Sequence, residues 1–182
     1  MTLLIIGIIL WSLAHWFKRL APKARSGLGN AGKGLVTVGI LAGLICMIFG
    51  YRTADFIAVW HPPAFMTHIN NLLMLVAFFV FGTSATTGRL RGWTRHPMLL
   101  SVKIWAVAHL LVNGDLASVL LFGGMLIWAV ISVILINKAE PNWTRPEPGE
   151  AKKDVLLVAI TVVTFSVTVG IHTWLGVSPI GG

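Results

Sequence analysis

Five of the six histidines in the chain lie within apolar stretches or at their edges. They are His15, His68, His96, His109 and His172. Ionisable side chains are costly in hydrocarbon, so those found in membrane spans usually mark functional sites. For any one of these histidines, a hydrogen bond between helices is the alternative interpretation. Taken together, we expect them to mark a site inside a membrane.

Carboxylates, which most histidine chemistry requires, are nearly absent from the apolar stretches. Four of the six acidic residues lie within 140–154, and the other two are Asp55 and Asp115. Paired-carboxylate catalysis therefore has no candidates, and neither His-Glu-x-x-His nor Gly-x-Ser-x-Gly occurs. Imidazoles accompanied by tryptophan and arginine suit a porphyrin. The imidazole nitrogens would bind the iron, apolar and aromatic side chains would cover the ring, and basic residues would contact the propionates. Without Cys-x-x-Cys-His, such a haem would be held non-covalently.

The segment 95–115 has the highest density of these side chains. In chain order they are Arg95, His96, Lys103, Trp105 and His109. Pro97 suits the first turn of a helix, where its missing N–H would be unpaired anyway. Asn113-Gly114-Asp115 is typical of a tight turn. The sequence therefore predicts a membrane helix over 97–113.

Two constraints follow from this helix. A lysine at mid-helix costs about 2.5–3.5 kcal/mol in a bilayer, so Lys103 should face a partner or a wet cavity. His96 and His109 are 13 residues apart, which is roughly 20 Å along a helix. We therefore do not expect one site to use both of these histidines directly.

The composition indicates an integral membrane protein. Hydrophobic residues make up 56% of the 182 residues and charged residues only 11%, whereas a soluble domain is about a quarter charged. Six apolar spans of roughly membrane length are expected. Their approximate ranges are 2–19, 35–52, 64–83, 97–113, 115–137 and 154–176. The first range is interpreted as a retained helix, because no basic segment precedes it.

The formal charge of +8 follows from basic residues in short links, which indicates membrane topology rather than nucleic-acid binding. Twelve Lys and Arg residues lie in the links 18–34, 83–96 and 138–153, and only Arg52 lies in the others. The positive-inside rule then places both termini outside. The predicted fold is all-α: one domain over 1–182, a bundle of six transmembrane helices with both termini on the outer, periplasmic side.

Three groups of residues, each on one face of an expected helix, are further candidates for a polar site or for helix packing. Ser12, His15 and Arg19 share a face, while the neighbouring Trp11 and Trp16 fit either an interfacial belt, which we favour, or the wall of a pocket. A stripe of small residues predicts close helix packing; its members are Gly39, Gly43, Cys46 and Gly50. A second stripe either bonds back to its own helix or faces a polar interior; its members are Thr161, Thr164, Thr168 and His172.

Several motifs together resemble a known family. They are Ala14-His15, Leu20-Ala21-Pro22, Thr94-Arg95-His96-Pro97, Ala108-His109-Leu110, Asn113-Gly114-Asp115 and the run that begins at His172. This set is similar to the NnrU family of bacterial multi-pass membrane proteins, associated with nitrite and nitric oxide respiration. The plant and cyanobacterial relative in that family is the 15-cis-zeta-carotene isomerase.

The resemblance implies a b-type haem with two histidine ligands to iron, His15 in the first helix and His109 after the Arg-His-Pro motif. The resemblance also implies that, in the isomerase branch, a thiolate three residues before the second histidine is exchanged for an imidazole on reduction. Ala106 stands at that position here, so we do not expect such a switch. By depth along their helices, His109 would match His172 or His68 better than His15; the family pairing is nonetheless preferred.

We therefore expect a bacterial inner-membrane protein that binds haem b and has a redox or nitric-oxide-linked role in denitrification. Trp105, Arg19 and Arg95 are expected to contact the haem. His172, His68, His96 and Lys103 are expected to support it or to provide an alternative ligand. Two alternatives remain open: a cis–trans isomerase of a carotenoid-like lipid, and a cofactor-free scaffold whose histidines only join helices. Expected partners are the bilayer, a redox protein or a small lipid, and not nucleic acid.

Overall fold

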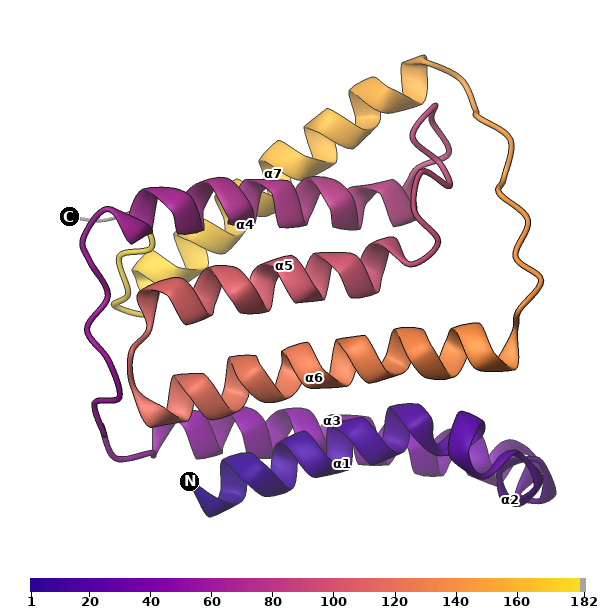
Figure 1. Cartoon of the computed structure of the whole chain (residues 1–182), viewed down its shortest axis with the longest axis horizontal. Coiled ribbons are helices and arrows are strands. Elements are labelled where there is room, and N and C mark those ends of the chain that lie inside the picture. Colours follow the sequence, from indigo (N-terminus) through magenta and orange to yellow (C-terminus); the bar gives the residue numbers. More distant parts are fainter. Residues whose placement is uncertain (181–182) are drawn as a thin grey trace. The chain divides into compact units, whose positions relative to one another are not determined.

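The computed structural model describes residues 1–180, which form helices joined by loops and one isolated β-bridge. Figure 1 shows the helices, whose bounds are α1 Thr2–Leu20, α2 Pro22–Gly27, α3 Gly29–Arg52, α4 Met66–Ala85, α5 Pro97–Val112, α6 Leu116–Ala139 and α7 Lys152–Trp174. The all-helical prediction is confirmed within this part of the chain.

Five of these helices are long and apolar enough to cross a membrane, namely α1, α3, α4, α6 and α7. The sixth predicted span, α5, begins at Pro97 as expected but has only 16 residues, or about 24 Å of rise. The six-span count and the orientation of the termini therefore remain predictions. The segment 18–34, which the sequence analysis described as a link between spans, is largely helical, because α2 and the first turns of α3 lie within it.

The helices group into two compact units. Unit 1 comprises Met1–His61 and Asn113–Pro141, and therefore contains α1, α2, α3 and α6. Unit 2 comprises Pro62–Val112 and the chain from Asn142 onward, and contains α4, α5 and α7. Each unit is thus built from two separate stretches of sequence.

Glycines determine how closely α1 and α3 approach each other in unit 1. A Cβ atom added to Gly43 would lie 2.7 Å from the backbone nitrogen of Trp11, and one added to Gly7 would lie 2.6 Å from that of Met47. Both distances are too short for non-bonded atoms, so only glycine allows this backbone contact. The predicted packing role of the small-residue stripe is confirmed for Gly43.

The turn before α6 is fastened to the segment that follows α3 in unit 1. Gly114 accepts a hydrogen bond from the backbone of Val59 at 2.7 Å. The carboxylate of Asp115 caps α6 by accepting from the backbone N–H of Ser118 at 2.9 Å. The Ser118 hydroxyl in turn lies 2.8 Å from the hydroxyl of Tyr51 on α3. The Asn-Gly-Asp turn is therefore both a helix start and a tie between α3 and α6.

In unit 2, α4 packs against both α5 and α7. The loop after α4 is held to α7 by Arg89, whose Nε lies 2.5 Å from Asp154 Oδ2. The backbone N–H of Gly149 donates to Gly88 at 3.1 Å. The segment 140–150 has no regular structure, as expected, but these contacts fix part of it against the loop after α4.

Candidate functional site

His15 is held in a defined orientation by its own helix. Its Nδ1–H donates to the backbone carbonyl of Trp11, one turn earlier in α1, at 2.8 Å. A carbonyl oxygen can only accept a hydrogen bond, so the proton of the neutral ring lies on Nδ1. Nε2 is then the nitrogen that carries a lone pair. This is the arrangement in which histidines bind metals, with the second ring nitrogen bonded to a carbonyl or carboxylate.

Two tryptophans surround the His15 ring. The ring centroid of Trp11 lies 4.3 Å from that of His15, and the centroid of Trp128, on α6, lies 5.0 Å away at an interplanar angle of 72°. The two indoles also contact each other, at 5.6 Å. Trp128 is only 7% exposed. His15 therefore lies against an aromatic wall built from α1 and α6.

Two hydrogen-bond donors of this cluster are buried and unsatisfied. The indole Nε1 atoms of Trp11 and Trp128 have no hydrogen-bond partner within residues 1–180. Leaving a buried donor unpaired costs about 1–3 kcal/mol. A polar acceptor bound beside His15 would remove that cost, so the cluster has donors to offer a ligand.

The neighbouring polar groups of α1 also point to α6. Trp16 donates its Nε1–H to the hydroxyl of Ser132 at 2.9 Å, and Arg19 forms a 2.7 Å ion pair with Glu140. Trp11 and Trp16 therefore contribute to the interface between α1 and α6. The interfacial-belt interpretation concerns the depth of these tryptophans in a membrane, and it stays a prediction.

His109, on α5, repeats the local arrangement of His15. Its Nδ1–H donates to the backbone carbonyl of Trp105 at 2.9 Å, and the two ring centroids lie 5.2 Å apart. Both helices share the pattern Trp-x-x-Ala-His, at Trp11 to His15 and Trp105 to His109. Helical geometry places residues i and i+4 on the same face. The same local motif therefore orients one imidazole in each unit.

His172 is bonded in the same manner as His109. Its Nδ1–H donates to the carbonyl of Thr168 at 2.8 Å. His172 and His109 both occupy the last turns of their helices, α7 and α5. These two predicted histidines belong to unit 2, whereas His15 belongs to unit 1.

The remaining predicted residues are more dispersed. His68 is exposed near the start of α4, and His96 directly precedes α5, where its carbonyl accepts from Leu100 at 2.9 Å. Lys103 is half-buried in the middle of α5, and Arg95 lies in the loop before that helix. Within residues 1–180, no three His, Cys, Asp or Glu side chains form a cluster that could hold a metal ion. A haem needs only one or two imidazoles, so this finding does not bear on it.

Sequence reasoning missed Trp128. No local pattern marks this residue, since its relation to His15 depends on the packing of α1 against α6. The Trp-x-x-Ala-His repeat, by contrast, was visible in the sequence and would have drawn attention to Trp11 as the partner of His15.

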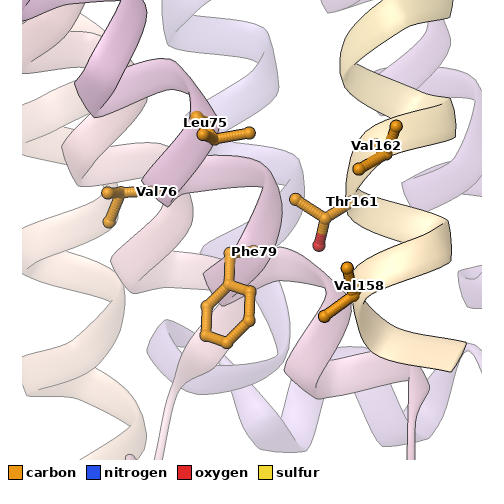
Figure 2. Close-up of a pocket in the computed structure, with 6 residues that line it drawn as sticks. All are labelled: Leu75, Val76, Phe79, Val158, Thr161 and Val162. Atoms are coloured by element: carbon orange, nitrogen blue, oxygen red, sulfur yellow. The ribbon is translucent and has the colours of Figure 1, made fainter. Parts of the chain in front are cut away.

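A groove of about 320 Å³ lies between α4 and α7, as Figure 2 shows. Its lining residues are Leu75, Val76, Phe79, Val158, Thr161 and Val162. None is a histidine, and the hydroxyl of Thr161 bonds back to the carbonyl of Leu157 at 2.8 Å. The Thr164 hydroxyl likewise bonds to Ile160 of its own helix. The hydroxyls of these two threonines therefore form hydrogen bonds within α7. This agrees with the first of the two alternatives for the stripe, in which its side chains bond back to their own helix.

The helical fold and its long apolar spans define a multi-pass membrane protein in which histidines on three helices, α1, α5 and α7, are oriented by carbonyls of their own helix. The family described as NnrU protein matches the chain over residues 3–179. The chain therefore belongs to the NnrU family. No curated protein and no solved structure matches it.

Proposed function

We propose that this NnrU family member binds haem b in the bacterial inner membrane and has a redox or nitric-oxide-linked role in nitrite respiration. His15 and His109 are the residues that would hold the haem iron. The observation that carries the proposal is the repeated Trp–His motif, in which each imidazole is bonded through Nδ1 to a carbonyl 2.8 or 2.9 Å away. Imidazoles oriented in this manner are suited to iron, because the outer bond fixes the tautomer and raises the basicity of Nε2.

The side chains around His15 fit a porphyrin as well. Trp11 and Trp128 supply flat apolar surfaces, and their unpaired indole N–H groups are available to a polar acceptor. Arg19 and Arg95 are the proposed partners of the propionates, and Trp105 is the proposed aromatic neighbour on the side of His109. When bound, haem would supply an iron that exchanges one electron or binds a diatomic gas.

The protein's own contribution is electrostatic and steric. Backbone carbonyls orient the imidazoles, and each tryptophan ring shields from water the imidazole that it contacts. Burial and hydrogen bonding around a haem are the means by which a protein sets its potential and its ligand preference. Ala106, fully buried on α5, offers no thiol that would compete with His109.

Absorption spectroscopy of the purified protein tests the proposal. The full chain, produced in haem-replete cells and extracted in mild detergent, should show a Soret band and reduced b-type bands. His109→Ala should abolish or strongly weaken that spectrum. The exposed His61→Ala is the matched control and should leave it unchanged.

A colourless wild-type protein that still elutes as a folded, helical species would refute the haem proposal. The histidines would then be structural elements of a scaffold. Loss of the spectrum in the His61→Ala control would equally show that histidine removal acts through folding and not through ligation.

A further inference from the structure

Six basic residues gather at one end of unit 1. They are Lys18, Arg19, Lys23, Arg25, Lys33 and Lys138. They belong to the end of α1, to α2, to the first two turns of α3 and to the end of α6, and Figure 1 shows these parts at the same end of unit 1. The ion pair between Arg19 and Glu140 joins the ends of α1 and α6 directly. We call this group the basic platform.

The charge of the basic platform is hardly compensated by the protein. Within residues 1–180, Arg19 is its only member that forms an ion pair, and Glu140 is the carboxylate it uses. In unit 2, by contrast, Arg89 pairs with Asp154 and Lys152 pairs with Glu150. The excess of positive charge at this end of unit 1 attracts negatively charged groups from outside the chain.

The length of α3 places the basic platform at the level of lipid headgroups. Its 24 residues extend about 36 Å, whereas the hydrocarbon core is about 30 Å thick. The apolar part of α3 begins at Leu35, just after Lys33. The first turn of α3, and α2 before it, therefore lie outside the hydrocarbon and beside the phosphates.

The surface of this region is amphipathic. No residue of α2 is buried, and the large apolar residues that flank it are exposed, Leu20 by 57% and Leu28 by 43%. Basic side chains beside exposed leucines are typical of segments that lie in the membrane interface. A water-soluble anion would leave these leucines in contact with water, while a lipid covers them with its acyl chains.

We propose that the basic platform binds the headgroup of an anionic phospholipid, with Lys23, Arg25 and Lys33 contacting the phosphodiester. Lysine and arginine bind phosphate oxygens by charge-assisted hydrogen bonds, and juxtamembrane basic clusters are typical recognition sites for anionic lipids. Leu20 and Leu28 contact the acyl chains of the same lipid. This inference is independent of haem binding.

Native mass spectrometry of the detergent-solubilised full chain tests the proposal. The probes are phosphatidylglycerol and phosphatidylcholine with identical acyl chains. The protein should retain phosphatidylglycerol at least tenfold more tightly. The combined substitution Lys23→Gln, Arg25→Gln and Lys33→Gln should reduce that preference at least tenfold, since each basic residue near an anionic surface contributes about 1 kcal/mol.

Two control variants distinguish lipid binding at a specific site from a general effect of the protein's net charge. Arg145→Gln, Lys152→Gln and Lys153→Gln remove the same charge from unit 2 and should preserve the preference. Lys23→Arg, Arg25→Lys and Lys33→Arg keep the charge of the basic platform and should also preserve it. Circular dichroism checks that each variant is helical. If the triple variant does not fold, the single Lys23→Gln variant replaces it, with a smaller expected loss of the preference for phosphatidylglycerol.

Three results would overturn the proposal. The first is equal retention of the two lipids by the wild-type protein. The second is an equal loss of preference in the unit 2 variant, which would reflect net charge alone. The third is displacement of phosphatidylglycerol by inorganic phosphate at a similar concentration, which would identify the ligand as a soluble anion.

Discussion

The Nδ1–H of His15 donates to the carbonyl of Trp11 at 2.8 Å, and the two rings lie 4.3 Å apart. This single turn of helix fixes which imidazole nitrogen carries the proton and which face of the ring is covered. Because the bond is made within one helix, it does not depend on how the two units pack.

Replacement of individual histidines should identify the second haem ligand. If His15 and His109 hold the iron, His15→Ala should convert a six-coordinate, low-spin spectrum into a five-coordinate, high-spin one. His172→Ala should then leave the low-spin spectrum unchanged. Absorption and electron paramagnetic resonance spectra of the oxidised proteins measure this difference. A high-spin His172→Ala variant beside an unaltered His15→Ala variant would instead identify His109 and His172 as the pair.

The close contact of α1 with α3 should make Gly43 sensitive to the smallest substitution. Gly43→Ala places a methyl group 2.7 Å from the backbone of Trp11, and overpacking of this kind costs about 1–3 kcal/mol. Thermal unfolding in detergent should show a lower midpoint. Gly123→Ala on α6 is the matched control, because no atom lies within 4 Å of the added Cβ; a comparable loss there would contradict the packing argument.

The cap of α6 should contribute measurably to stability. Asp115→Ala removes the acceptor for the backbone N–H of Ser118, and loss of an N-cap costs about 0.5–2 kcal/mol. Asp115→Asn keeps an acceptor oxygen and should lose much less. Denaturation midpoints of the two variants in the same detergent measure the effect, and equal midpoints for alanine and asparagine would show that the cap is unimportant.

The distribution of basic residues should fix the orientation in the membrane. Starting from Cys46→Ala, which removes the single cysteine, Asp55→Cys should react with a membrane-impermeant maleimide in intact spheroplasts. Lys23→Cys should react only after the membrane is permeabilised, because the positive-inside rule places that link in the cytoplasm. The reverse labelling pattern would place the N-terminus in the cytoplasm.

Sequence alone determined the features of this protein that depend on neighbouring residues. Apolar runs separated by charged links gave the approximate ranges of all six long helices, since each helix satisfies its own backbone hydrogen bonds wherever it lies. Pro97 marked a helix start, because its fixed φ suits a first turn. Asn113-Gly114-Asp115 marked the break before α6, where Asp115 caps the helix. The small-residue stripe of α3 predicted close packing for the same local reason.

Only the tertiary structure decided which surfaces meet. It placed Trp128 against His15, placed Trp11 and Trp16 in the interface of α1 with α6, and assigned His15 and His109 to different units. It also showed that the first basic link is helical. In a bilayer, nearly every helix is apolar on all sides, so hydropathy does not indicate which face contacts a neighbour. That choice is made by shape, through glycine contacts and the few polar groups that find partners across helices.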